Sequence, residues 1–113
     1  MKRQKMRMAD PILREAAGYT ATASFPVAPA GLACDAEIWL SRDGVSKDAT
    51  SGPRGFTSTG EPQAVSLPVT MPVGGYEYRV YLDVFANGML IAAYEATENV
   101  IVPSVGPIDI IWE

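Results

Sequence analysis

The chain has 113 residues, of which 48% are hydrophobic and 19% are charged. This length fits one domain, and this balance is typical of a folded globular domain rather than a disordered segment. No apolar run approaches the roughly 20 residues that span a bilayer, so we expect no membrane partner. The chain contains no histidine and one cysteine, Cys34. These two facts remove the usual general base, the usual zinc ligand and any internal disulfide.

Charge is distributed unevenly along the chain. Residues 1–14 carry five basic residues and one acidic residue, for a net charge of +4, whereas the remainder carries 4 basic and 12 acidic residues, for a net charge of −8. The chain starts with basic residues, as a secretory signal does, but Ala9-Asp10-Pro11 follows where an apolar region is required. We therefore expect no secretory signal.

The chain divides into a basic N-terminal arm over 1–17 and a β-sandwich domain over 18–113. Within the arm, Asp10 can act as an N-cap and Pro11 can occupy the first helical position. This pattern predicts a short helix over 9–17.

The basic residues of the arm are Lys2, Arg3, Lys5 and Arg7. They would form a solubilising tail or dock on an acidic neighbour, such as the acidic body of another copy. Nucleic acid is an unlikely partner because no aromatic residues interleave the basic ones. We expect no core strand in residues 1–8.

Alternating apolar and polar residues predict strands from residue 18 onward. Strands are expected over 18–26, 33–41, 62–71, 76–85, 89–102 and 108–112, with short edge strands around 46–49 and 55–58. Pro68 restricts its strand to an edge or a bulge. The side chains expected to face inward are Tyr19, Ala21, Ala23, Phe25, Cys34, Ala36, Ile38, Leu40, Val65, Leu67, Val69, Met71, Tyr76, Tyr78, Val80, Leu82 and Val84.

Asn87-Gly88, between two alternating runs, is a strong hairpin signal. A two-residue turn would place the charged Glu95 on the buried face. A three-residue turn instead places Val84 opposite Leu90 and Arg79 opposite Glu95. We expect the second register because it buries no charge and forms an opposite-charge pair across the strands.

The segment Gly75–Val84, followed by Asn87-Gly88, resembles the late hairpin of fibronectin-III-like and CARDB-like modules of the immunoglobulin-like superfamily. Such modules often carry a Gly-Tyr-x-Tyr-x-Val stretch at this place. The resemblance implies an immunoglobulin-like antiparallel β-sandwich of about seven strands, an all-β fold. Modules of this kind serve as spacers, adhesion modules and virion decoration modules, so the fold alone does not select a function.

No pattern of catalytic or cofactor-binding residues is found. Cys34 lies on an inward face, where a free cysteine usually packs as a small hydrophobe, and Lys47 is the only lysine outside the arm. Asp43 and Asp48 flank a turn, and two such carboxylates can hold calcium, but no regular ligand spacing is present and the ordinary role of an aspartate in a hairpin turn explains them better. We expect no enzyme, no cofactor and no metal.

An apolar stripe remains on the outward face of the late hairpin. Tyr81, Phe85, Met89 and Ile91 share this face, and Trp39 points outward on its own strand. Tyr, Trp, Phe and Met are the side chains favoured at protein interfaces. The stripe therefore predicts a subunit interface, unless the N-terminal segment or the long loop covers it.

Two functional hypotheses follow. In the first, the chain is a non-enzymatic structural or assembly protein, such as a phage head decoration or tail-associated component. It would bind other protein subunits as a homo- or hetero-oligomer through the stripe and the basic arm. Its expected location is then a virion or, before assembly, the host cytoplasm. In the second, it is a cell-surface adhesion or carbohydrate-binding module with Trp39 on its binding face. Capsid and portal genes beside this one would favour the first.

Overall fold

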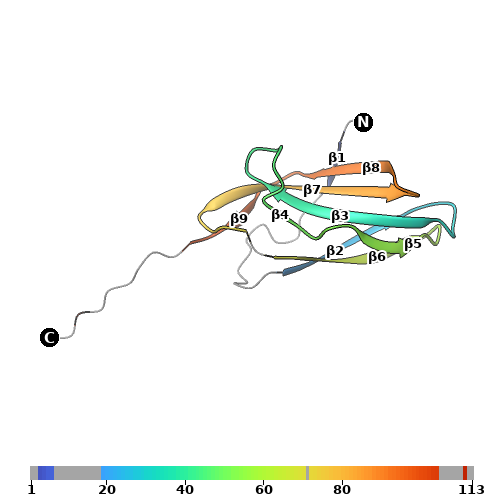
Figure 1. The fold of residues 1–113 in the computed structure, drawn as a ribbon, viewed down its shortest axis with the longest axis horizontal. Helices are drawn as coiled ribbons and strands as arrows, with labels where there is room; N and C mark the ends of the chain where they lie inside the picture. Colours follow the sequence, from blue (N-terminus) through green and yellow to red (C-terminus); the bar gives the residue numbers. More distant parts are fainter. Residues whose placement is uncertain (1–2, 7–18, 71, 105–110, 112–113) are drawn as a thin grey trace.

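The chain has the all-β fold that its sequence predicts. A computed structural model describes residues 3–6, 19–70, 72–104 and 111, and no helix in that part of the chain could cross a membrane. The strands are β1 (Gln4–Met6), β2 (Tyr19–Pro26), β3 (Ala33–Ser41), β4 (Ala49–Thr50), β5 (Arg54–Thr57), β6 (Pro62–Val69), β7 (Tyr76–Ala86), β8 (Met89–Ala96) and β9 (Val100–Val102) (Figure 1).

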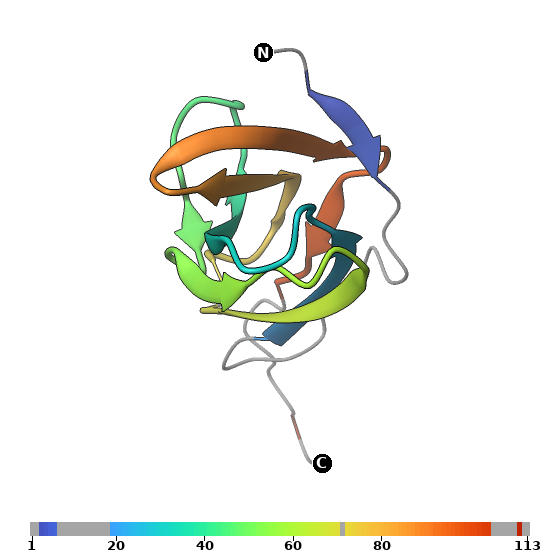
Figure 2. The same cartoon turned by 90° about the vertical axis from the view of Figure 1, so that its right-hand side faces the viewer.

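The strands form two sheets that face each other (Figure 2). The larger sheet has the order β1-β8-β7-β3-β4, with β5 also paired to β3 and β9 also paired to β7. The smaller sheet consists of the antiparallel pair β2 and β6. The strand β7 is the centre of the larger sheet because it pairs with β3, β8 and β9.

The inward faces of both sheets supply one hydrophobic core. Phe25 of β2 and Leu67 of β6 belong to the same cluster as Leu40 of β3 and Val80 of β7. Alternation places these side chains inward because successive residues of a strand point to opposite faces. The inward positions predicted for β3, and those predicted for β6 as far as Val69, are confirmed as buried, Cys34 among them.

The two central strands are buried on both faces over much of their length. Trp39 and Glu37 of β3, and Tyr81 and Asp83 of β7, lie on the outward face, yet each is less than 9% exposed. A sheet face that bears charged residues normally meets water, so some other part of the chain must cover this one. The covering segments define the candidate site described below.

The register predicted for the β7–β8 hairpin is wrong. Asn87 and Gly88 both have positive φ, 50° and 78°, which is the geometry of a two-residue type I′ turn. Ala86 then pairs with Met89, and a bulge shifts the later pairs so that Val84 faces Ala92 instead of Leu90. The shift is two residues, a full strand period, so Val84 and Ala92 keep their inward face. Glu95 lies opposite Tyr81 rather than the predicted Arg79.

Other predicted elements have mixed outcomes. Two short strands follow β3 as expected. The strand β5, at Arg54–Thr57, overlaps the predicted 55–58, whereas β4, at Ala49–Thr50, lies almost wholly after the predicted 46–49. The expectation of no core strand in residues 1–8 is wrong for part of the arm, because β1 pairs in parallel with β8 and Met6 packs against the core. The predicted helix over 9–17 and the residue Met71 lie outside the described residues. So does the predicted strand over 108–112, apart from Ile111.

Tyr78 fastens the start of β7 to the turn that precedes it. Its side chain is 1% exposed, and its hydroxyl donates a hydrogen bond to the carbonyl oxygen of Val73. Burial raises the pKa of Tyr78 above its ordinary value of 10.0, so the hydroxyl keeps its proton at neutral pH. The Tyr78 side chain is buried, so its hydroxyl would lose free energy without an acceptor, and the Val73 carbonyl supplies one.

We therefore expect Tyr78→Phe to lower the free energy of unfolding by about 1 kcal/mol, because it removes the hydrogen bond between the buried Tyr78 hydroxyl and the Val73 carbonyl. Urea denaturation followed by circular dichroism measures the change. Tyr76→Phe is the matched control, since Tyr76 is 47% exposed and its removal of a hydroxyl should cost much less. Equal losses in the two variants would contradict this role for the Tyr78 hydroxyl.

Candidate functional site

The outward face of the larger sheet carries a stacked aromatic pair. Trp39 and Tyr81 lie directly opposite each other on β3 and β7. Their rings are 4.4 Å apart between centroids, with an interplanar angle of 27°. Both side chains are almost fully buried, at 6% and 5% exposure. Opposed aromatic residues on neighbouring strands stack because cross-strand positions hold their Cβ atoms close together.

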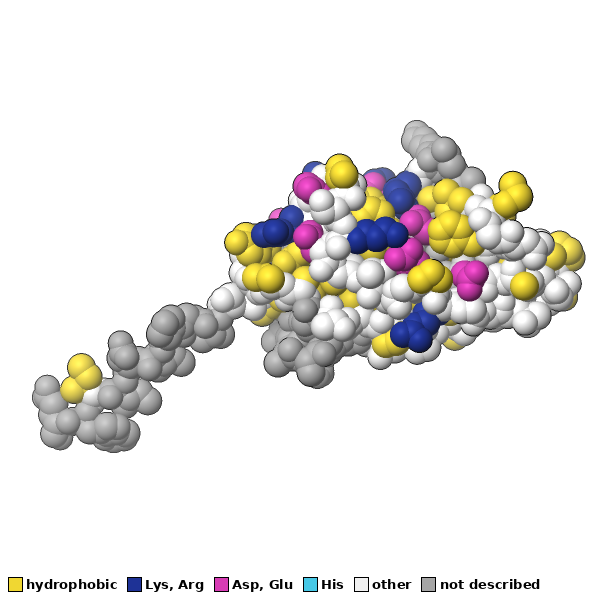
Figure 3. Space-filling model, viewed as in Figure 1, with side chains coloured by type: hydrophobic (Ala, Val, Ile, Leu, Met, Phe, Trp, Pro, Cys, Tyr) yellow, Lys and Arg dark blue, Asp and Glu magenta, His cyan; other side chains and the backbone are white. Residues whose placement is uncertain are grey.

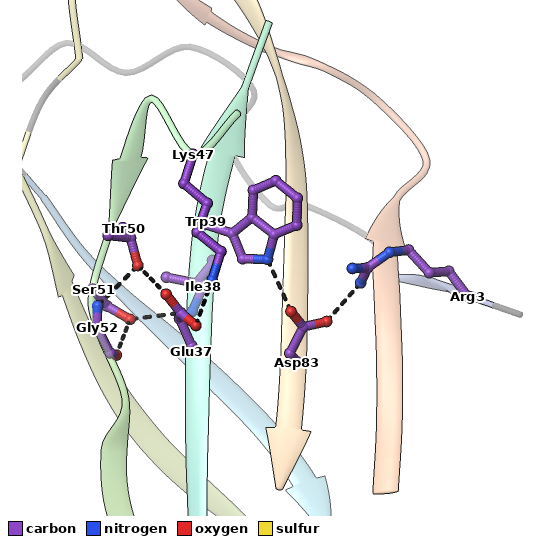
Figure 4. Close-up of polar contacts among 9 residues, drawn as sticks. All are labelled: Arg3, Glu37, Ile38, Trp39, Lys47, Thr50, Ser51, Gly52 and Asp83. Carbon is purple, nitrogen blue, oxygen red and sulfur yellow. Dashed lines mark hydrogen bonds and ion pairs between the residues drawn. The ribbon is translucent and has the colours of Figure 1, made fainter. Parts of the chain in front are cut away.

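Asp83 joins the aromatic pair to the N-terminal arm (Figure 4). Its Oδ2 accepts a hydrogen bond of 3.0 Å from Trp39 Nε1, and its Oδ1 forms a 2.7 Å ion pair with Arg3 Nη1. Arg3 also donates to the carbonyl oxygen of Tyr94, at 3.2 Å. The Asp83 carboxylate is therefore satisfied on both oxygens, as a buried charge must be.

Two cations lie over the aromatic rings. The guanidinium carbon of Arg3 is 4.6 Å from the Tyr81 ring centroid and 5.6 Å from that of Trp39. Lys47, from the loop between β3 and β4, has its Nζ 5.4 Å from the Trp39 ring. Cation–π attraction of this kind adds to the ion pairs that hold the same two cations.

Glu37 anchors the loop that carries Lys47. Its Oε1 pairs with Lys47 Nζ at 2.9 Å, and its Oε2 accepts a hydrogen bond from Thr50. Arg3, Glu37, Trp39, Lys47, Tyr81 and Asp83 together form what we call the outer-face cluster. Its carboxylates and cations are paired with one another. The cluster therefore stabilises the packing of the arm and of this loop against the outward face of the sheet.

Asp43 organises the loop that follows β3. Its Oδ1 accepts hydrogen bonds of 2.8 Å from the backbone N–H groups of Val45 and Ser46, and one of 2.9 Å from the Ser41 hydroxyl. The backbone N–H donors of Ser46 and Val45 lower the pKa of Asp43 from 3.8 to about 2. Asp48 accepts from the Arg42 backbone N–H instead. Within the described residues, no group of three acidic or thiol side chains could hold a metal ion.

An exposed apolar surface lies at the β7–β8 turn. Met89, Leu90 and Ile91 are 72%, 42% and 42% exposed, and we call them the edge patch. Among the described residues, the strand that pairs with the outer side of β8 is β1, which reaches only Tyr94 to Ala96. The edge patch therefore combines apolar side chains with a strand edge that β1 does not cover.

A shallow hollow adjoins the edge patch. Its volume is about 220 Å³, and it lies between β8 and the end of β2. It is lined by Phe25, Pro26, Val27, Ala28, Val84, Ile91, Ala92 and Tyr94. Most of these side chains are apolar, so the hollow suits an apolar side chain rather than a charged one.

The structure thus divides the predicted interface residues into two groups. Trp39, Tyr81 and Arg3 meet in the outer-face cluster, where the chain itself covers the two rings. Lys5 pairs at 3.2 Å with Glu95 on the solvent-exposed edge. Met89 and Ile91 are exposed, Phe85 beside them is half-buried, and Lys2 and Arg7 lie outside the described residues. The interface role of all these residues remains a prediction.

Sequence reasoning missed several members of the two sites. Glu37, Lys47 and Asp83 were not among the predicted interface residues, although Glu37 and Asp83 stand on the same strand faces as Trp39 and Tyr81. The alternation of residues along each strand could have predicted that Glu37 and Asp83 lie beside Trp39 and Tyr81. Lys47 comes from a loop, and no sequence pattern predicts where a loop side chain will lie. Two inward predictions are wrong: Tyr76 and Leu90, the latter expected opposite the inward Val84, are 47% and 42% exposed.

Comparison with known proteins adds no relative to this description. No family model matches the chain, and no curated protein or solved structure matches it. The function is therefore argued from the geometry of the chain alone.

We expect Arg3→Ala to lower the free energy of unfolding by about 1–2 kcal/mol, because it removes a partner of Asp83 and a cation over two rings. Lys5→Ala, which removes a more exposed ion pair, should change the free energy of unfolding by no more than about 0.5 kcal/mol.

Tryptophan fluorescence tests the covering role of Arg3 directly. In a Trp112→Phe background, Trp39 is the remaining tryptophan, since the chain has two. Its emission should shift to longer wavelength only in Arg3→Ala. Unchanged emission would contradict the covering role of Arg3.

The Asp43 carboxyl should titrate near pH 2 in a carbon-detected NMR experiment. Because its pKa in the folded chain is below the ordinary value, its contribution to stability is present above pH 3.8 and is lost as pH falls through about 2. Asp43→Ala should speed hydrogen exchange at the Val45 and Ser46 amides. The Gly60 amide, bonded to the Val27 carbonyl at 2.9 Å, is the internal control. Unchanged exchange at Val45 and Ser46 would refute the turn role.

Proposed function

We propose that the chain is a non-enzymatic assembly module with an immunoglobulin-like β-sandwich fold. Two structural features support the fold. The pairings of β2 with β6, of β3 with β7 and of β7 with β8 are those of two facing antiparallel sheets with crossed connections. The Tyr78 hydroxyl bonded to a backbone carbonyl five residues upstream has the form of a tyrosine corner at the start of a late strand.

The observation that carries the functional proposal is the edge patch. Three consecutive apolar side chains are exposed at a strand edge, and the segment from Met89 to Tyr94 contains no charge and no proline. Proteins that stay apart usually protect such an edge with lysine, proline or a covering segment. An edge without these protections is suited to pairing with another polypeptide, through backbone hydrogen bonds and apolar contact. Among the residues that the structure describes, the protective feature of this edge is the bulge at Ile91.

The outer-face cluster argues against catalysis and sugar binding at this face. Its carboxylates are engaged in ion pairs and hydrogen bonds, so none is free to exchange a proton with a substrate. A sugar would have to stack on Trp39, but Arg3 and Lys47 already lie over that ring. The adhesion and carbohydrate-binding hypothesis would therefore require these cations to move. Membership of a virion remains a prediction, which the identity of the neighbouring genes would test.

The proposal predicts that the protein self-associates and that Met89→Lys weakens this association by on the order of tenfold. Met89 is 72% exposed, so the substitution should leave folding intact. Val45→Lys is the matched control, because Val45 is 82% exposed and lies in the loop after β3, away from the β7–β8 turn. Sedimentation velocity over a concentration series measures association. A monomeric parent protein, or equal association of Met89→Lys and the parent, would overturn the proposal.

A further inference from the structure

We propose that the edge patch binds the segment Ile108–Trp112 of a second copy of this chain as an added strand. The inference rests on the proposed function, and names the partner of the same surface. It rests on three observations. The edge of β8 has no strand partner over Met89 to Ala93 among the described residues, the segment Ile108–Trp112 has the alternating apolar pattern of a strand, and the distance along β7 is too long for the segment to reach the edge patch of its own copy.

The receptive edge lies along the first half of β8. Beyond the reach of β1, the outer side of Met89 to Ala93 has no strand partner among the described residues. Backbone N–H and C=O groups along such an edge are available to an incoming strand. The hollow beside Ile91, of about 220 Å³, would receive an apolar side chain from that strand. Figure 3 shows hydrophobic side chains at this end of the molecule.

The segment Ile108–Trp112 has the composition of a strand. Ile108, Ile110 and Trp112 alternate with Asp109 and Ile111, so one face of an extended segment would carry two isoleucines and a tryptophan. Ile111, which the structure describes, belongs to no strand and is 83% exposed. Its exposure shows that this isoleucine has no place in the core of its own copy.

The topology prevents the segment from reaching the edge patch of its own copy. Val102, the end of β9, pairs with Tyr76, whereas the edge patch lies at the level of Phe85. These levels are nine residues apart along β7, or about 30 Å at 3.3 Å per residue. Six residues lead from Val102 to Ile108 and span at most about 21 Å.

Chain direction adds to the distance. The strand β9 is antiparallel to β7 and therefore runs away from the β7–β8 turn (Figure 1). The chain would have to reverse before it could return along the sheet. A second copy can present its edge patch without this constraint, and so it is the occupant that the geometry favours.

The resulting contact joins two different surfaces, the tail segment of one copy and the edge patch of the next. Such a heterologous contact leaves one free edge and one free segment at the ends of every assembly, so it repeats. The expected product is a series of oligomers that grows with concentration, or a closed ring. A symmetric pairing of two β8 edges would instead stop at a dimer.

A complementation experiment with two full-length variants tests this inference. Ile110→Lys damages the donated segment and keeps the edge, whereas Ile91→Lys damages the edge and keeps the segment. Each variant alone should associate at least about tenfold more weakly than the parent. Their equimolar mixture should form a 1:1 dimer that does not grow, because only one productive contact remains. Sedimentation velocity and native mass spectrometry report these species.

Controls separate this inference from the proposed function. Ile111→Lys alters the opposite face of the segment and should associate like the parent, which would support insertion of the Ile110 face. Urea melts check that Ile91→Lys folds, and Met89→Lys offers a second, more exposed edge variant. If Met89→Lys weakens association but Ile110→Lys does not, the edge patch binds something other than the segment, and the inference fails while the proposed function stands. If neither edge variant weakens association, both fail.

Discussion

The structure depends on the burial of one carboxylate, that of Asp83. This group is 8% exposed at the centre of the larger sheet, where an unpaired charge would cost several kcal/mol. The Trp39 indole donates a hydrogen bond to one oxygen of this carboxylate, and the Arg3 guanidinium forms an ion pair with the other. These contacts draw β3, β7 and the arm to one point, and Arg3 reaches β8 through the Tyr94 carbonyl. Removal of one partner would therefore affect several elements at once.

The outward face is consequently a second, smaller region of burial. The main core between the sheets is apolar, and its members follow from alternation alone. The outer-face cluster is held by ion pairs, hydrogen bonds and ring stacking, and its cover comes from the arm and from the loop that carries Lys47. This arrangement gives the positively charged arm a site on its own acidic body. The edge patch, in contrast, carries neither charge nor cover from the described residues.

The sequence was sufficient for the features that depend on local pattern. The inward faces of β3 and β6, the position of the β7–β8 turn and the edge location of Pro68 follow from period-two alternation and turn chemistry. The hairpin register could not be predicted in this way. A three-residue turn was expected because it keeps Glu95 off the buried face, but the chain achieves the same result with a two-residue turn and a bulge. The pairing of β1 with β8 was hidden as well. It depends on Arg3 meeting Asp83, a long-range contact that no local period records.

The contact between Arg3 and Asp83 also constrains the order in which the chain can fold during synthesis. The two residues are 80 positions apart, and Arg3 and Tyr94 are 91 positions apart. A ribosome therefore releases the arm long before its acceptor exists, so β1 is among the last strands that can pair. Until then, Trp39 lacks its cation from the arm. A nascent chain therefore leaves the Trp39 ring without one of its two covering cations until the strands that hold Arg3 have been made.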